Sequence, residues 1–364
     1  MSQDSKRQNE DPSIVNTIRK DLRQPDLKRH LQRDFKELKE YMLSEGRQER
    51  LRSMNTIQQY LYGFWWLLKS MILKLTPLRR LMLVLGLLIL LIPSQGDAGD
   101  DKKFQILGGL LLTFVVMLEV KDKLVAQKEL EAGHAVQKAL MPKRNPEVPG
   151  WSIWLFTRSA NEVGGDLVDF CKITNDRYEV AVGDVAGKGL TAALMSMKLQ
   201  ATVRALAPEY SSLSILAAKL NEIFCRDSLP SLFSSLVYLE LQPNSGAVRF
   251  FNAGHLPPFV CRGTNIDKTP KGGIAMGLKP GVSYEEQQLD LKSGDVLILY
   301  SDGLTEAQNE QEEFFGEQRL SDFLSRRAGL PTEEFGERLV HEVDEFLGDA
   351  RANDDLSLAV IKRM

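Results

Sequence analysis

The stretch YEVAVGDVAGKGLTAALMS (residues 178–196) decides the fold class of this chain. Its first eight residues are mostly apolar and rich in valine, which predicts a strand, and a glycine-rich turn then leads into a helical pattern over 191–207. Other short apolar runs also predict strands: SSLVYLEL, AVRFFNAGH, DVLILYSDG and LSLAVIK. Further helical patterns cover 213–225 and 333–347. This order predicts an α+β sandwich rather than a regularly alternating parallel sheet.

Four aspartates recur at the edges of these predicted strands. They are Asp166 in NEVGGDLVDF, Asp184 in VAVGDVAGKG, Asp302 in LYSDGLTEA and Asp354 in RANDDLSLAV. Three of them adjoin a glycine, which leaves room for an ion beside the carboxylate. Mg²⁺ and Mn²⁺ prefer such oxygen ligands, although an aspartate in this context is, by itself, more often a turn or helix-capping residue than a ligand. The set therefore predicts a hard-cation site, and the chain contains no HExxH, Cys/His cluster or GxSxG elbow to compete with it.

Five ordered blocks carry a resemblance to a known family. They are EVGGDLVDF, VGDVAGKGLTAALMS, FNAGHLPPFV, GDVLILYSDGLTEAQN and DDLSLAVIK. Together they resemble the SpoIIE-type (RsbU-like) bacterial branch of the metal-dependent, type 2C-like (PPM) serine/threonine protein phosphatases, over residues 140–364. The resemblance implies an αββα sandwich of two stacked antiparallel sheets with a centre of two Mn²⁺ or Mg²⁺ ions at one end.

The resemblance also implies roles for individual residues. Asp184 would bridge the two ions, next to the backbone carbonyl of Val185, and the ligand set would be completed by Asp166, Asp302 and Asp354. A water held between two cations has a lowered pKa, so we expect a bridging hydroxide to attack the phosphorus without a protein nucleophile.

Other polar residues near these motifs have open roles. Asp355 adjoins a ligand and could orient Asp354 or a metal-bound water. Lys188 and a metal-bound water are the candidates for the general acid, because the histidine that eukaryotic relatives carry after the GDG-like aspartate is absent here. We expect His255 to make a loop-stabilising hydrogen bond. For Glu162, as for Asp169, capping and ligation are equally open.

The predicted activity is hydrolysis of phosphoserine or phosphothreonine on a signalling partner, which the resemblance suggests is an anti-sigma-factor antagonist. Two alternatives stay open. One is a catalytically silent scaffold with the phosphatase fold, which an intact set of four aspartates disfavours. The other is a two-metal phosphohydrolase with a small-molecule substrate.

The residues before the phosphatase motifs predict helices and a membrane tether. Residues 1–56 are polar with a broken helical pattern, and 60–75 mix aromatic side chains with lysines, as at a membrane interface. Within the segment 57–120, two apolar runs, about 78–94 and 104–120, predict a transmembrane hairpin, with a pair of buried soluble helices as the alternative. Its basic outer flanks and acidic turn predict a bacterial inner-membrane location with the phosphatase domain cytoplasmic.

A helical segment connects the hairpin to the phosphatase domain. Residues 121–142 carry apolar residues at helical spacing, and the proline-rich PKRNPEVPG marks the boundary to a domain over 143–364. This segment could form a homodimer as a coiled coil, and the resemblance suggests that it regulates the metal site.

The composition of the chain bears on its binding partners and on its cellular compartment. The net charge of −3 does not favour binding to nucleic acid, and three cysteines far apart in the sequence predict a reducing compartment. The polar first 30 residues predict no cleavable signal peptide.

Overall fold

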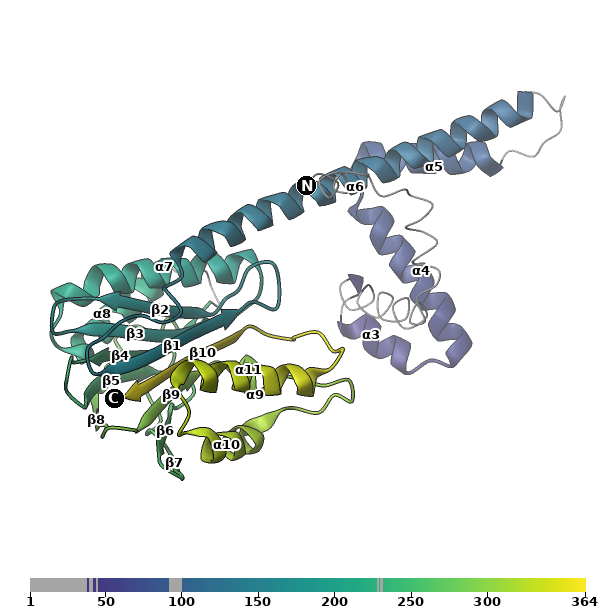
Figure 1. Ribbon diagram of the computed structural model, residues 1–364. Coiled ribbons are helices and arrows are strands. Elements are labelled where there is room, and N and C mark those ends of the chain that lie inside the picture. The colour runs from purple at the N-terminus through teal and green to yellow at the C-terminus, as the bar shows by residue number, and fades with distance from the viewer. Residues whose placement is uncertain (1–37, 39–41, 44, 92–99, 228, 230–231) are drawn as a thin grey trace, which may run out of the picture. The chain divides into compact units, whose positions relative to one another are not determined.

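The computed structural model describes residues 38, 42–43, 45–91, 100–227, 229 and 232–364 (Figure 1). The chain divides into two compact units, Met1–Lys123 and Leu124–Met364. Helix α6 (Asp100–Leu140) runs through the boundary between them, so the second predicted hairpin segment and the predicted connecting segment are one continuous helix.

The described part of the first unit is helical. Before α6 it contains α3 (Glu45–Arg52), α4 (Thr56–Lys74) and α5 (Pro77–Leu91). Helix α4 begins where the Asn55 side chain accepts a hydrogen bond from the backbone N–H of Gln58 at 3.0 Å. Residues 1–37 of the predicted polar helical region lie outside the described residues.

Helix α5 lies against the first part of α6. A Cβ on Gly86 would be 3.3 Å from the carbonyl oxygen of Gly108, so the two backbones approach as closely as only glycine permits. Near the start of α5, Arg79 pairs with Glu119 at 2.7 Å and with Asp122 at 2.6 Å. These contacts hold the two helices side by side.

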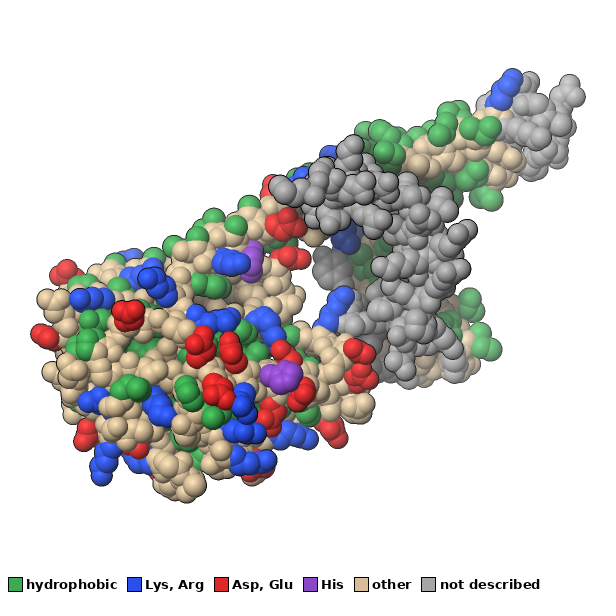
Figure 2. All heavy atoms as spheres, in the orientation of Figure 1, with side chains coloured by type: hydrophobic (Ala, Val, Ile, Leu, Met, Phe, Trp, Pro, Cys, Tyr) green, Lys and Arg blue, Asp and Glu red, His purple; other side chains and the backbone are tan. Residues whose placement is uncertain are grey.

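The structure does not support the predicted transmembrane spans. Both segments are helical where described, but within the described residues no helix has the length and apolar content needed to cross a membrane. The predicted turn, 92–99, lies outside the described residues. Large apolar side chains on both helices are exposed, as Figure 2 shows along α5 and the first part of α6. The predicted inner-membrane location rested on these spans and stays a prediction.

The second unit is a sandwich of two five-stranded antiparallel sheets, as the resemblance implied. One sheet has the order β1-β10-β9-β6-β7 and the other the order β2-β3-β4-β5-β8. The strands of the first are β1 (Trp151–Arg158), β10 (Leu356–Arg363), β9 (Val296–Tyr300), β6 (Phe259–Arg262) and β7 (Asn265–Lys268). Those of the second are β2 (Leu167–Lys172), β3 (Tyr178–Val185), β4 (Ser234–Leu241), β5 (Ala247–Ala253) and β8 (Gln287–Asp290).

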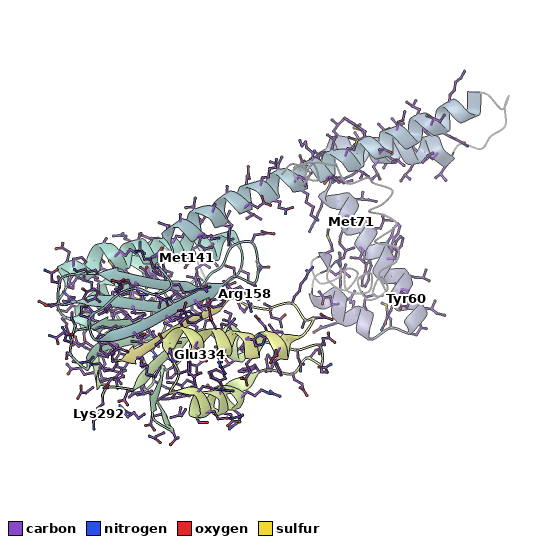
Figure 3. All side chains as sticks on the ribbon, viewed as in Figure 1. Tyr60, Met71, Met141, Arg158, Lys292 and Glu334 are labelled. Carbon is purple, nitrogen blue, oxygen red and sulfur yellow. The ribbon has the colours of Figure 1, made fainter. Side chains whose placement is uncertain are left out.

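Helices cover the outer face of each sheet (Figure 1). On the β2–β8 sheet lie α7 (Leu190–Leu206) and α8 (Leu213–Asp227), joined by the short helix η1 (Ala207–Glu209). On the other sheet lie α10 (Gly316–Arg327) and α11 (Thr332–Leu347), and the short α9 (Asp302–Thr305) follows β9. Arg158, labelled in Figure 3 at the end of β1, pairs with Asp344 of α11 at 2.6 Å.

Successive side chains of each strand point to opposite faces of the sheet, so each sheet contributes apolar side chains to a core on both of its faces. In β3, Val180 and Val182 point into the core between the sheets, while Ala181 faces α7 and α8. On the other outer face, Gly336 of α11 lies over Trp154, where an added Cβ would be 2.2 Å from the ring. The predicted helices near 191–207, 213–225 and 333–347 are all present.

One buried acid lies on the helix-covered face of β3. The Glu179 side chain is fully buried, and neither of its carboxyl oxygens has a hydrogen-bond partner among the described residues. It lies opposite Glu240 in the sheet. Burial, and then the nearby Asp169 carboxylate, raise the pKa of Glu179 well above its usual range.

We expect Glu179→Gln to stabilise the protein at neutral and alkaline pH. Because the folded-state pKa is raised, Glu179 contributes stability in its protonated form, and this contribution is lost as pH rises above the unfolded value. Glutamine keeps the neutral form at every pH. The melting temperature at pH 8 should rise by roughly 2–6 °C, with little gain at pH 4.5. The exposed Glu285→Gln is the matched control, and an equal gain at both pH values would contradict the assignment.

Candidate active site

The sheet register brings the four predicted aspartates to one end of the sandwich. Asp184 is the penultimate residue of β3, and Asp166 directly precedes β2, which pairs antiparallel with β3 so that Leu167 is opposite Gly183. Asp302 begins α9 just after β9, and Asp354 lies two residues before β10, which pairs with β9 so that Leu358 is opposite Tyr300. Each sheet therefore contributes two aspartates.

A pocket of about 450 Å³ opens at this end of the sandwich. Asp184, Asp302 and Glu306 line it together with the loop that contains Lys271. Asp166 lies outside this pocket and lines a small cavity of about 20 Å³ next to α7. Met141, labelled in Figure 3 directly after α6, lines the same small cavity. Asp354 lines neither of them, and its side chain is half exposed.

Burial and neighbouring carboxylates raise the pKa values of the aspartates at this end of the sandwich. Burial raises the pKa of Asp184 to about 7, with further contributions from Asp302, Asp354 and Asp355. Burial and then Asp354 raise the pKa of Asp302. The pKa of Asp166 is raised well above its usual range, mainly by burial. Such crowding of negative charge is typical of a site that binds cations.

The donor chemistry of these residues fits a divalent metal, but their spacing in this structure does not form a metal site. The donor set consists of carboxylate oxygens, and Oδ2 of Asp166 is buried without a hydrogen-bond partner among the described residues. Both features fit a hard cation. Within the same residues, however, no three acidic, histidine or cysteine side chains are spaced to hold a metal ion. The ligand assignment to Asp166, Asp184, Val185, Asp302 and Asp354 stays a prediction.

His255 links the two sheets beside the pocket. Its Nδ1 is 2.7 Å from Oγ of Ser235 in β4, and its Nε2 is 3.1 Å from the carbonyl oxygen of Tyr300 in β9. Because a carbonyl only accepts, Nε2 carries the proton and Nδ1 accepts from Ser235. Burial lowers the pKa of His255 to about 4, so the ring is neutral at pH 7. Ser235 is opposite Asp184 in the sheet, and Tyr300 lies two residues before Asp302. His255 thus fixes the spacing between two sheets that each carry a pocket aspartate.

The Asn252 side chain holds the loop that carries His255. Oδ1 of Asn252 accepts from the backbone N–H of His255 at 2.8 Å, and its Nδ2 donates to the His255 carbonyl oxygen at 3.0 Å. These bonds agree with the predicted loop-stabilising role of this motif.

We expect His255→Leu to lower kcat for a phosphomonoester at least about tenfold, because the Asp184 and Asp302 strands lose their link. His255 is neutral across pH 6–8, so the shape of the pH profile over that range should not change. Steady-state kinetics with p-nitrophenyl phosphate would measure both, and His341→Leu, on the exposed face of α11, is the control. Loss of one limb of the profile in His255→Leu would instead indicate proton transfer by His255.

A family comparison agrees with this geometry. The model for stage II sporulation protein E (SpoIIE) matches residues 174–364, which is more than half of the chain. The chain belongs to the SpoIIE family. Its C-terminal unit is therefore a SpoIIE-type protein serine/threonine phosphatase domain.

Individual relatives resemble this SpoIIE-family chain over part of their length. Protein IcfG of Synechocystis sp. is 26% identical over 276 residues, which is 66% of this chain but only 43% of IcfG. Phosphoserine phosphatase RsbU of Bacillus subtilis is 25% identical over 240 residues, 65% of this chain and 70% of RsbU. The solved SiaA-PP2C domain of Pseudomonas aeruginosa aligns with a TM-score of 0.58 at 21% identity, over 66% of this chain and 98% of that domain. The similarity to the SiaA-PP2C domain shows that the aligned part of this chain has the same fold as that domain.

In this SpoIIE-type domain, Asp355 positions the loop that carries Asp166. Its Oδ1 accepts from the backbone N–H of Ala160 at 2.8 Å, and its Oδ2 accepts from that of Gly165 at 2.6 Å. A Cβ on Gly164 would be 2.5 Å from the same Oδ2. The Asp355 side chain therefore orients the Asp166 loop, which the sequence did not predict. Its backbone N–H also donates to Oδ1 of Asp354 at 2.9 Å. The predicted effect on Asp354 or a metal-bound water stays a prediction.

The structure separates other predicted residues from the pocket. Lys188 donates to the carbonyl oxygen of Asn353 at 2.7 Å and lies 3.5 Å from Asp354, and it does not line the pocket. Lys188 is thus next to a predicted metal ligand, and its role as general acid stays a prediction. Glu162 is exposed and also lies outside the pocket lining. Asp169 is buried under α7, where it pairs with Arg204 at 2.8 Å and accepts from Gln200 at 3.0 Å. Through these bonds the Asp169 side chain holds α7 against β2.

No pattern in the sequence predicted that the loop containing Lys271 lines the pocket. Thr269 donates its backbone N–H to the Pro258 carbonyl oxygen at 3.0 Å, and Gly273 donates to that of Asn252 at 2.8 Å. A Cβ on Gly272 would be 2.1 Å from the same Asn252 oxygen. The adjacent glycines after Lys271 were the available signal, but only the fold brings them against the NAGH motif.

Proposed function

We propose that this chain is a metal-dependent phosphatase that hydrolyses phosphoserine or phosphothreonine in a signalling protein. The observation that carries the proposal is a pocket that Asp184, Asp302 and Lys271 line together. The family membership and the similarity to a phosphoserine phosphatase support it. By the same resemblance, we propose an anti-sigma-factor antagonist as the class of substrate.

The pocket residues divide into groups with opposite charge. Lys271 presents an ammonium group and forms no ion pair with any residue that the structure describes, so it is available to a phosphoryl oxygen. Asp184 and Asp302 would hold two divalent cations together with Asp166, Asp354 and the Val185 carbonyl. When bound, such ions neutralise phosphoryl charge and supply an activated water. Ser235 and His255 keep the two sheets at the distance that this arrangement needs.

An assay of the full chain tests the proposal. We expect release of phosphate from p-nitrophenyl phosphate and from a phosphoserine peptide when Mn²⁺ is present, and loss of both activities with EDTA. Asp302→Asn should lower kcat/KM at least about 100-fold, because one carboxylate of the set is removed. Asp267→Asn, on the exposed edge strand β7, is the matched control and should retain the wild-type rate.

Two results would overturn the proposal. The first is an absence of hydrolysis by the wild type with any divalent metal, which would favour the scaffold alternative. The second is an equal rate in wild type and Asp302→Asn. Hydrolysis of p-nitrophenyl phosphate without any phosphopeptide hydrolysis would favour a small-molecule substrate.

A further inference from the structure

Exposed apolar side chains lie in three segments of the phosphatase domain, two of which also contribute residues to the pocket lining. Leu190 and Leu194 of α7 are 48% and 53% exposed, Phe233 is 36% exposed, and Ile274 and Leu278 are 43% and 56% exposed. Within the described residues of 143–364, the other large apolar side chains with comparable exposure are Ile215, Leu229, Phe314 and Met364. Five of these nine side chains, Leu190, Leu194, Phe233, Ile274 and Leu278, lie in the three segments, and we call them the apolar rim.

Backbone hydrogen bonds hold the rim segments together. The N–H of Ala186, four residues before Leu190, donates to the carbonyl oxygen of Phe233 at 2.9 Å. Ser234 and Met276 exchange two backbone hydrogen bonds, at 2.9 and 2.8 Å. Leu190 and Leu194 are one helical turn apart and share a face of α7. The rim is thus a fixed surface, so binding to it requires little ordering.

The rim is continuous with the pocket. Phe233 lines the pocket, and so do Gly273 and Ala275 on either side of Ile274. Lys271 lines it from the same loop. A phosphoryl group held between Lys271 and the aspartates would therefore place the residues next to it in the substrate chain against the rim.

We propose that the apolar rim is a docking surface for the phosphoprotein substrate, and that it selects phosphorylated residues flanked by apolar side chains. This inference rests on the proposed phosphatase function and specifies its substrate class. The charge of Lys271 complements the phosphate, and the rim complements the apolar neighbours of the phosphorylated residue. A free phosphomonoester would leave the rim uncovered.

Two synthetic phosphoserine peptides of equal length and charge test the inference. One carries leucine and valine on both sides of the phosphoserine, and the other carries serine and glycine there. The full chain should hydrolyse the apolar peptide with a kcat/KM at least about tenfold higher, the effect of burying one or two aliphatic side chains. In Ile274→Ser/Leu278→Ser this preference should fall to about twofold or less. A second double variant, Leu190→Ser/Leu194→Ser, tests the α7 side of the rim in the same way.

The preference is the ratio of the kcat/KM values of one enzyme for the two peptides. A loss of activity that affects both peptides equally therefore does not change it. Ile215→Ser, on α8 and outside the rim, is the matched control and should keep the wild-type preference. Equal hydrolysis of both peptides by the wild type, or an unchanged preference in both rim variants, would overturn the docking surface and leave the phosphatase function standing. A wild type that hydrolyses neither the peptides nor p-nitrophenyl phosphate would remove both proposals.

Discussion

Asp184→Asn is expected to lower phosphatase activity by about 1,000-fold while making the metal-free protein more stable. The activity falls because the central carboxylate of the proposed site becomes a neutral amide. The stability rises because burial and three neighbouring carboxylates oppose ionisation of Asp184, whose pKa is about 7. The raised pKa means that Asp184 stabilises the fold while protonated, and that this contribution is lost as pH rises through about 7. In EDTA, the variant's gain in melting temperature should therefore grow from pH 6 to pH 8.

Opposite changes in activity and stability identify a functional residue, since a packing residue would lose both. Differential scanning calorimetry and the p-nitrophenyl phosphate assay measure the two effects on one preparation. Asp267→Asn is again the control. An Asp184→Asn protein that retains wild-type activity would exclude the proposed site.

Gly303→Ala is expected to lose both activity and stability. A Cβ on Gly303 would be 2.0 Å from the carbonyl oxygen of Asp355, so the start of α9 and the start of β10 would have to move apart. This movement would displace Asp302 from its neighbours and disturb the Asp355 side chain that holds the Asp166 loop. We expect a loss of about 3 kcal/mol in unfolding free energy, roughly 6–12 °C in melting temperature, and at least about 100-fold in kcat/KM.

Gly329→Ala is the matched control for this steric effect, because a Cβ there meets no atom within 4 Å. Thermal unfolding and phosphate release would be measured on both variants. A Gly303→Ala protein with wild-type stability would contradict the close packing of α9 against β10.

The sequence was sufficient to predict the sandwich because its strands and helices are locally encoded. The alternation in YEVAVGDV places Val180 and Val182 on one face and Ala181 on the other, and the structure follows that pattern. The pocket residues Asp184 and Asp302 were also identified, because each lies at a strand end, whereas Glu306, which follows the short helix α9, was not. The motif order then supplied the family.

The remaining features depend on contacts between distant segments. Lys271 reaches the pocket because Gly272 and Gly273 pack on Asn252, about twenty residues earlier in the chain, and no periodic pattern reports such a contact. The role of Asp355 depends on hydrogen bonds to residues nearly 200 positions away. The predicted membrane spans are not supported, because no helix among the described residues is long and apolar enough to cross a membrane.

The last turns of α6 determine where the phosphatase domain can be cut. Gln137 donates to the Gly164 carbonyl oxygen at 2.8 Å and accepts from its N–H at 3.2 Å, and the Leu140 carbonyl oxygen accepts from Gln200 and Arg204 at 3.2 Å. A truncated chain that begins at residue 143, the boundary that the proline-rich stretch suggests, would lose both Gln137 bonds to Gly164, two residues before Asp166, while Gln200 and Arg204 would keep their bonds to Asp169. A fragment that begins at Leu124 keeps the Gln137 bonds, so the smallest self-contained catalytic fragment includes the end of α6.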